Sequence, residues 1–370
     1  MNAEPTPSTG LWGEAFRVER GGIDLRAGLA GGIASCAPLA VGIATGHAAI
    51  GSVACFGGLN AALGVPRGPL RGRLGWGAGA ALACSLSVLV TTAVQDSTAA
   101  SVIVAFVWIA LATMLRTFGA VGGLAGFVIG AMLVILGGIP AAPVDAGERM
   151  LWFAAGSALG TALMVLAYGS EPGGGTGKNH AAPAAPPLAA VIVAGARQYV
   201  AAARHDRALQ AHALRLATAV AATTLLYRAL GLEHGYWIPL TVLAILQPDE
   251  HASRVRAIQR AVGTLCGTAV IALLTVVTGE QWVLVAVQGI AAGALFSLFA
   301  RGYFWLVVLL TPTALLTVSA VDYQGAAIAL ERAGWSALGI ACGLAVGEAV
   351  WQLAPHLAPG RRPWESTGAE

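Results

Sequence analysis

The chain contains twelve long apolar stretches, and this series constrains its fold more than any other feature. Six fall at about 26–45, 48–65, 74–95, 98–115, 118–138 and 150–169, and six more at about 211–232, 236–247, 261–279, 282–300, 303–320 and 333–353. Roughly 20 apolar residues in a helix span the roughly 30 Å hydrocarbon layer of a bilayer. The runs are continuous, whereas membrane strands alternate. The sequence predicts an all-α polytopic membrane protein with about twelve transmembrane helices, whose second and eighth spans are short enough to be partly re-entrant.

Composition excludes several other classes of protein. Of the 370 residues, 57% are hydrophobic and 11% are charged, too few polar side chains for the surface of a soluble protein. No basic block has the interleaved aromatic residues that would suggest nucleic acid. No nucleophile elbow, Walker lysine or metal-ligand spacing occurs, so we expect no enzyme, no cofactor and no metal. The expected environment is the lipid bilayer.

The distribution of lysine and arginine predicts the orientation. If the N-terminus lies inside, only Arg149, Arg228 and Arg332 of the 21 cationic residues fall at outside ends. Cytoplasmic loops are enriched in lysine and arginine. We therefore expect both termini in the cytoplasm.

The two sets of six spans form an internal repeat. The arginines Arg26, Arg67 and Arg71 recur 189 positions later as Arg215, Arg256 and Arg260. The motif ERxxWxxxGxxxG occurs twice, beginning at Glu148 and at Glu331. Six spans per copy give both copies the same orientation, related by a pseudo-two-fold axis along the membrane normal. The spaced glycines predict close helix packing of the sixth and twelfth spans.

These features divide the chain into five regions. Residues 1–24 form a cytoplasmic N-terminal segment without an apolar leader, and residues 25–170 form the first six-helix repeat. Residues 171–210 form a flexible Gly/Pro/Ala-rich linker followed by a short helix. Residues 211–354 form the second repeat, and residues 355–370 form a cytoplasmic tail.

The segment 233–268 carries a signature with two parts. The first part is YWIPLTVLAILQPD at residues 236–249, and the second is RAIQRAVGTLCG at residues 256–267. Tyr236 and Trp237 suit a membrane–water interface, and Pro248 should end the short span. The signature residues are Tyr236, Trp237, Pro239, Thr241, Pro248, Asp249, Gly263 and Thr264.

This signature resembles that of the fusaric acid resistance family of bacterial aromatic-acid exporters. It is also similar to the corresponding hairpin of the plant aluminium-activated malate transporters. The first resemblance implies a multi-pass protein of the bacterial inner membrane. The second implies a dimer of six-span subunits around a central pore, here fused into one chain. A further homo-oligomer stays open.

Two groups of charged residues are candidates for function. Guanidinium groups bind carboxylates bidentately, so arginines near the axis could line an anion pathway, although they could equally anchor the topology. These candidates are Arg26, Arg67, Arg71, Arg215, Arg256 and Arg260. Glu148, Glu331 and His234 lie at the outer ends of spans, where they could couple transport to protons or gate it. Interfacial capping and solvation are the alternatives for these three residues.

Together these inferences predict a transporter that exports small organic anions, in particular aromatic carboxylic acids, along a pathway between the repeats with proton coupling. A passive organic-anion channel is one alternative, as the malate-transporter resemblance implies. A membrane scaffold that assists envelope assembly is another.

Overall fold

The computed structural model describes residues 10–18, 21–64, 70–141, 144–168, 188–321 and 325–353, and every regular element in these ranges is a helix. A short helix, α1 (Leu11–Ala15), precedes the first half. The first half consists of α2 (Leu25–Ala44), α3 (Ala48–Gly64), α4 (Leu70–Ala93), α5 (Thr98–Met114), the 3₁₀ helix η1 (Leu115–Phe118), α6 (Gly119–Gly138) and α7 (Ala146–Tyr168). A linking helix, α8 (Leu188–His205), follows. The second half consists of α9 (Arg207–Ala229), α10 (Trp237–Ile245), α11 (Glu250–Val277), α12 (Gln281–Ser297), the 3₁₀ helix η2 (Phe299–Arg301), α13 (Tyr303–Ser319) and α14 (Ala327–Leu353).

Each expected apolar stretch coincides with one of these helices, so the all-α prediction is confirmed. Within the described residues, five helical segments are long and apolar enough to cross a membrane. They are Leu25–Ala44, Gly72–Ala93, Thr98–Gly138, Ala146–Tyr168 and Glu250–Val277. Three shorter apolar helices accompany them, at Ala48–Leu63, Gln281–Ser297 and Tyr303–Ser319.

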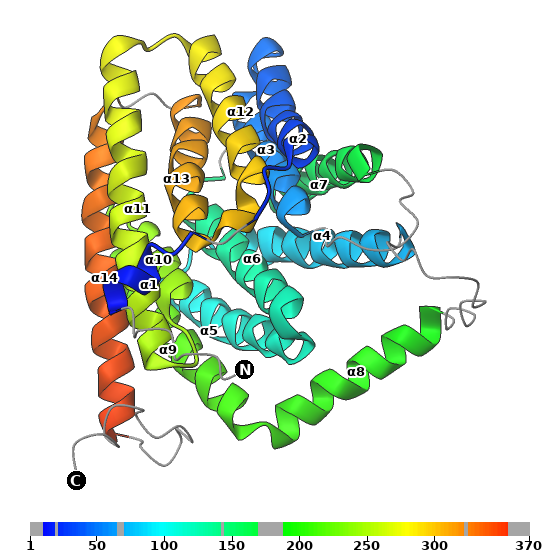
Figure 1. Ribbon diagram of the computed structural model, residues 1–370, viewed down its shortest axis with the longest axis vertical. Coiled ribbons are helices and arrows are strands. Elements are labelled where there is room, and N and C mark those ends of the chain that lie inside the picture. Colours follow the sequence, from blue (N-terminus) through cyan, green and yellow to red (C-terminus); the bar gives the residue numbers. More distant parts are fainter. Residues whose placement is uncertain are drawn as a thin grey trace, which may run out of the picture.

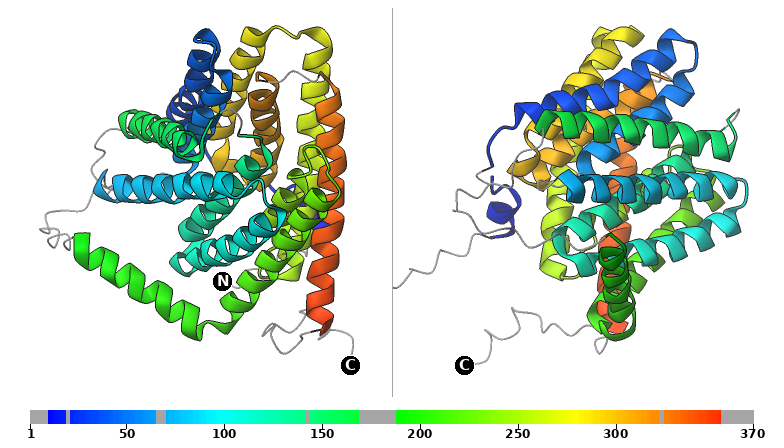
Figure 2. Two further views of the ribbon diagram at one scale, coloured as in Figure 1. Left: turned by 180° about the vertical axis from the view of Figure 1, so that it is seen from behind. Right: turned by 90° about the vertical axis from the view of Figure 1, so that its right-hand side faces the viewer.

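The two halves use matching sets of contacts. In the first half α7 packs on α3 and α4, and in the second half α14 packs on α10 and α11. Between the halves, α2 packs against α12 and α5 packs against α9 (Figure 1). The long helices of the two halves cross instead of running parallel, since α4 and α7 lie across the direction of α11 and α14 (Figure 2).

Buried polar contacts hold the halves together as well. At the α2–α12 contact, Gln288 Nε2 donates to Ser35 Oγ at 2.7 Å and to Thr317 Oγ1 at 3.3 Å. At the other contact Arg228 donates to the carbonyl oxygens of Gln95 at 2.6 Å and Gly137 at 3.2 Å. Hydrogen bonds between helices satisfy polar groups that have no access to water.

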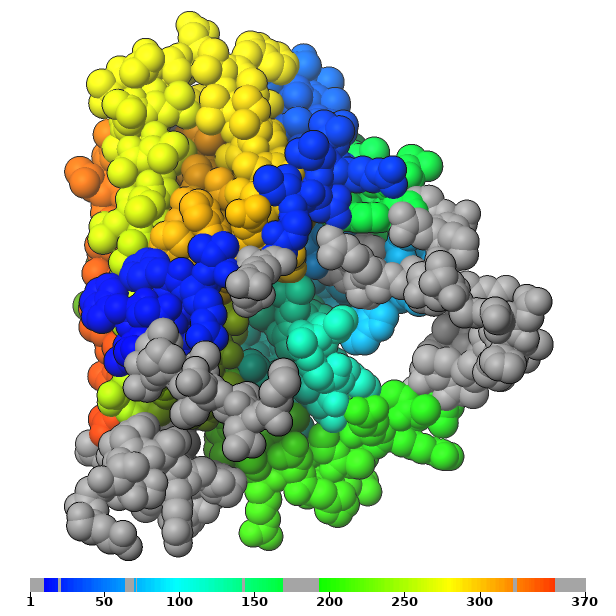
Figure 3. All heavy atoms as spheres, viewed as in Figure 1, coloured from blue at the N-terminus to red at the C-terminus, as the bar shows by residue number. Residues whose placement is uncertain are grey.

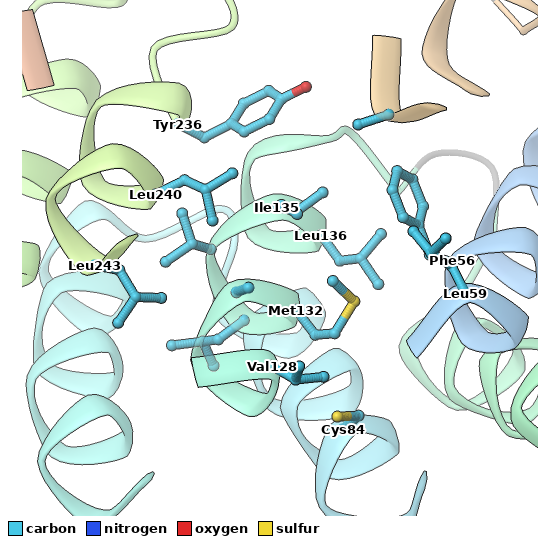
Figure 4. Packing of buried hydrophobic residues seen from close by; sticks show 14 of the residues in the cluster. Phe56, Leu59, Cys84, Val128, Met132, Ile135, Leu136, Tyr236, Leu240 and Leu243 are labelled. Carbon is cyan, nitrogen blue, oxygen red and sulfur yellow. The ribbon is translucent and has the colours of Figure 1, made fainter. Parts of the chain in front are cut away.

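Helix α6 lies at the centre of the molecule. Every residue from Val128 to Leu136 is buried, and these residues belong to one large apolar cluster. Figure 4 shows α6 between α10, which contributes Tyr236 and Leu240, and α3, which contributes Phe56. The halves therefore meet across a tightly packed apolar layer.

The repeated glycines allow close helix packing, as predicted. A Cβ atom on Gly156 would collide with the carbonyl oxygen of Ala54 in α3. In the second half a Cβ atom on Gly339 would lie 2.7 Å from Thr241 Cβ in α10. The same spaced glycines thus seat α7 on α3 and α14 on α10.

Helix α10 is short, as predicted, and it is also completely enclosed. All nine of its residues are buried, and at 1.5 Å per residue it is about 14 Å long. The chain becomes extended at Leu246, shortly before Pro248, because the residue preceding a proline disfavours helix. Asp249 then caps α11 by accepting from the Ala252 amide at 2.7 Å. Because of this cap α11 begins at Glu250, well before the expected start at residue 261.

Two helices lie on the outside of the helix bundle. α8 extends away from the other helices (Figure 1) and is held by hydrogen bonds from Gln198 and Tyr199 to carbonyl oxygens of Thr117 and Leu111, each at 2.8 Å. α1 lies on the surface of the second half (Figure 3), where Gln259 of α11 donates to the Ala15 carbonyl at 2.9 Å. The expected linker 171–187 and tail 355–370 lie outside the described residues.

Candidate functional site

A cavity of about 450 Å³ lies between the two halves. The first half contributes α5, η1 and α6, and the second half contributes α9, α10, α11, η2 and α13. None of the lining residues is acidic. The polar and charged lining side chains are Thr113, Arg116, Gln247, Arg256 and Tyr303. We call this space the arginine cavity.

The two halves each supply one arginine to the arginine cavity. Arg116, from η1, donates to Gln247 Oε1 at 3.2 Å. Arg256, from α11, lies over the ring of Tyr303 at 3.8 Å from its centroid. The two guanidinium groups are close enough to interact electrostatically. Two positive charges that face one space with no acidic residue in its lining create a favourable potential for an anion.

The predicted pathway residue Arg215 has a structural position beside this cavity. It is 7% exposed and donates to the main-chain carbonyl of Gln247. The main-chain N–H of Gln247 in turn donates to Ser253 Oγ at 2.9 Å. Arg215 also lies 3.4 Å from His212 Nδ1. These contacts hold the extended segment that follows α10.

The first-half counterparts do not join the arginine cavity. Arg26 is exposed at the start of α2 and lines a separate shallow depression with Ala300. Arg67 lies outside the described residues, and Arg71 lies in the first turn of α4, where only its backbone is described. The expected pairing of Arg67 with Arg256 is therefore untested, and Arg116 is the first-half arginine that faces Arg256.

Arg260 lies deeper than Arg256 on α11. Its side chain is 3% exposed, and it forms no hydrogen bond or ion pair with any described residue. Its Nε atom is buried without a partner. An anchoring arginine keeps its charged end in water, so this burial favours the pathway interpretation of Arg260, which stays a prediction.

The candidate outer residues behave differently in the two halves. His234 Nδ1 lies 2.9 Å from Glu331 Oε2, which joins the loop before α10 to the first turns of α14. His234 has a φ of 53°, an uncommon conformation for a residue with a side chain. In the first half, Glu148 accepts from Trp152 Nε1 at 3.3 Å, within its own helix.

The signature residues fill the region around α10. Tyr236 and Trp237 are each 1% exposed, so they lie within the protein and do not face the membrane–water interface as expected. The tight approach of Gly138 to the Tyr236 ring explains this burial, because glycine leaves room for the ring against α6.

The remaining signature residues lie at helix ends or at helix contacts of α10 and α11. Pro239 is in the first turn of α10, Thr241 faces Gly339, Pro248 and Asp249 separate α10 from α11, Gly263 packs on Val307, and Thr264 is buried on α11.

Three residues of this region were missed by the sequence interpretation. Arg116 and Tyr303 lie at helix starts, and neither was among the site candidates. Arg332 was placed at an outside end within the repeated motif that begins at Glu331, but it was not among the pathway candidates. The signal that could have identified Arg332 is its position within an apolar helix that is longer than the predicted span.

The fold and the arginine cavity define a multi-pass membrane protein whose charged centre lies between two helical halves. Residues 220–346 match the family described as fusaric acid resistance protein-like. The matched segment begins within α9 and ends within α14, so it covers most of the second half.

Two curated relatives match short parts of the chain. "Uncharacterized protein ORF2" of Neisseria gonorrhoeae is 39% identical over 79 residues, which are 20% of this chain and 19% of that protein. "Inner membrane protein YccS" of Escherichia coli K12 is 38% identical over 65 residues, 18% of this chain and 9% of that protein. The chain thus spans less than a fifth of the length of either relative. No solved structure matches it.

Proposed function

We propose that this protein exports small organic anions, in particular aromatic carboxylates, across the bacterial inner membrane. The observation that carries the proposal is the arginine cavity, where Arg116 and Arg256 face a common space with no acidic lining residue. In a membrane protein such a cavity attracts anions, and guanidinium groups bind carboxylates with suitable geometry. The match to the fusaric acid resistance protein-like family supports the same substrate class.

The packing supports two related six-helix repeats, whose long helices cross instead of running parallel (Figure 2). The contacts of α2 with α12 and of α9 with α5 exchange equivalent helices, as a two-fold axis requires. In this arrangement both termini would face the cytoplasm, and we place the mouth of the arginine cavity on that side because Arg116 and Arg256 belong to the predicted inside segments. It would receive the substrate from the cytosol.

The route beyond the arginine cavity is closed. α6 and α10 are in contact at Gly130 and Leu243, and at Gly138 and Tyr236. An apolar layer of this kind blocks a permeant ion, so transport requires a rearrangement of the halves. This favours a transporter over a permanently open channel.

Proton coupling would reside in the second half. His234 and Glu331 form a contact of 2.9 Å at the end of α14 opposite its cytoplasmic terminus. Histidine exchanges protons in the physiological pH range, and a change in its charge alters a contact with a carboxylate. An inward proton gradient would then drive export of the anion.

Flux in proteoliposomes tests the proposal. The purified chain would be reconstituted and loaded with radiolabelled benzoate, and efflux would be followed with and without a pH gradient. We expect efflux that the gradient accelerates several-fold. Gradient-independent, conductive flux would identify a channel, and the absence of flux for benzoate and related carboxylates would contradict transport.

A further inference from the structure

A second group of cationic side chains lies inside the second half, away from the arginine cavity. Arg332 of α14 is 2% exposed, and its guanidinium carbon lies 3.9 Å from the centroid of the Trp237 ring of α10. Arg260 of α11 is 3% exposed and interacts electrostatically with Arg332. Three helices thus bring two guanidinium groups and an indole ring together.

Neither arginine has a counter-charge among the described residues. Arg260 and Arg332 form no hydrogen bond or ion pair within the part of the chain that the structure describes. Arg332 Nη1 and Arg260 Nε are both buried without a partner. A buried charge is costly unless it is paired and hydrogen-bonded, and two like charges that share one interior raise this cost.

Other buried polar groups on the same three helices, or next to them, also lack hydrogen-bond partners within the described ranges. Tyr236 Oη, Trp237 Nε1, Thr241 Oγ1, Thr264 Oγ1 and Ser336 Oγ are all buried without a partner. Their residues are each at most 2% exposed. Buried polar groups in proteins nearly always have partners, so several orphans in one region require an explanation.

The helix geometry places these donors on facing surfaces. On α14, Ser336 is one turn after Arg332 and faces α10, because Gly339 in the following turn contacts Thr241. On α10, Trp237 and Thr241 are one turn apart. Trp237 lies opposite Arg332 of α14, and Thr241 lies opposite Gly339 of α14. On α11, Thr264 follows Arg260 by one turn.

We propose that the Arg260–Arg332 pair, with the donors of α10 around it, forms an occluded binding site for one small aromatic carboxylate. A carboxylate would neutralise the charge of the pair and accept from guanidinium, indole and hydroxyl donors. The rings of Tyr236 and Trp237, whose centroids are 4.7 Å apart, provide an aromatic wall for a planar substituent. We call this the occluded site.

Tyr303 connects the occluded site with the arginine cavity. The Arg256 guanidinium lies 3.8 Å from the centroid of its ring, and Tyr303 also lies in the neighbourhood of Arg332. Tyr303 Oη is itself buried without a partner. An anion that moves from Arg256 past Tyr303 would pass from the cavity between the halves into the interior of the second half.

This inference rests on the proposed function for its substrate class, but binding can be measured without transport. The full chain in lipid nanodiscs would be titrated with sodium benzoate by calorimetry, with sodium chloride and sodium cyclohexanecarboxylate as comparison ligands. We expect saturable benzoate binding, weaker binding of cyclohexanecarboxylate and no competition by equimolar chloride. Equal competition by chloride would overturn the assignment to a carboxylate.

The chain offers a matched control for the decisive substitution. Arg332→Gln should weaken benzoate binding at least tenfold, and Arg332→Lys should retain part of it because the charge is kept. Arg149→Gln changes the corresponding arginine of the first repeat and should leave benzoate binding unchanged. Thermal unfolding of each variant reports folding separately, and the lysine variant preserves the test if the glutamine variant is unstable.

The outcomes separate the site from the function. Wild-type affinity in folded Arg332→Gln, or no benzoate binding by the wild-type chain, would contradict the occluded site even if proteoliposomes transport benzoate. Loss of binding in Arg332→Gln together with no flux by the wild-type chain would support the site and contradict the transport function.

Discussion

Arg149 and Arg332 occupy the same position in the repeated ERxxWxxxG motif, but their surroundings are opposite. Arg149 donates to the carbonyl oxygens of Leu136 and Ile139, each at 3.0 Å, at the C-terminal end of α6. Arg332 has no such acceptor and lies over the ring of Trp237. Carbonyl oxygens at a helix end are natural partners for arginine.

The difference between these two arginines originates in their neighbours. The first half has Ala48 where the second has Trp237, so it lacks the indole ring over which Arg332 lies. In the second half, α13 corresponds to α6. At its C-terminal end Gln281 donates to the Ala320 carbonyl at 2.5 Å. One copy of the motif thus stabilises a helix end, and the other leaves a charge available for a ligand.

The largest expected effect concerns packing in the first half. Gly156→Ala would place a Cβ atom against the Ala54 carbonyl, and backbone cannot move aside as a side chain can. We expect a loss of about 2–3 kcal/mol in the free energy of unfolding. A Cβ atom on Gly339 would meet Thr241 Cβ at 2.7 Å and the Ile238 carbonyl oxygen at 2.8 Å, which is a smaller overlap than the one with the Ala54 carbonyl oxygen at Gly156, so Gly339→Ala should cost less. Thermal unfolding of the two variants in detergent compares them, and equal losses would contradict a more rigid first half.

An intermediate effect concerns anion recruitment. Arg256→Gln removes one of the two cationic side chains of the arginine cavity and should reduce benzoate flux about tenfold, which corresponds to about 1.4 kcal/mol. Arg26→Gln, in the first half, changes an exposed residue outside the cavity and should alter flux less than twofold. Initial rates in proteoliposomes measure both. A large effect of Arg26→Gln would show that anions are also recruited outside the arginine cavity.

The smallest expected effect concerns proton coupling. Glu331→Gln weakens the contact with His234 and should abolish the several-fold stimulation of flux by a pH gradient, while flux without a gradient changes little. Glu148→Gln removes a carboxylate that bonds only within α7 and should retain the stimulation. The ratio of rates with and without the gradient is the readout. Retained stimulation in Glu331→Gln would assign coupling elsewhere.

The sequence predicts the helices well because their signal is local. Twelve apolar stretches and two sets of spaced glycines are sufficient to place twelve of the helices and two of the close helix contacts. The early start of α11 was missed because its first turns are basic, and the cap by Asp249 outweighs their polarity.

The candidate site was less predictable because it depends on contacts between distant segments. Arg149 and Arg332 share one motif, and only the neighbouring α6 end or Trp237 ring distinguishes them. Arg116 belongs to the first half in sequence but meets Gln247 and Arg256 in space. Tyr236 and Trp237 have the composition of interfacial residues, and their burial depends on the close approach of Gly138.

The shortness of α10 has an electrical consequence. A helix of about 14 Å extends over about half of the roughly 30 Å hydrocarbon layer. A full elementary charge that crosses 100 mV changes free energy by about 2.3 kcal/mol. An anion that moves along the whole of α10 would cross a comparable share of the membrane voltage, so turnover should depend on voltage.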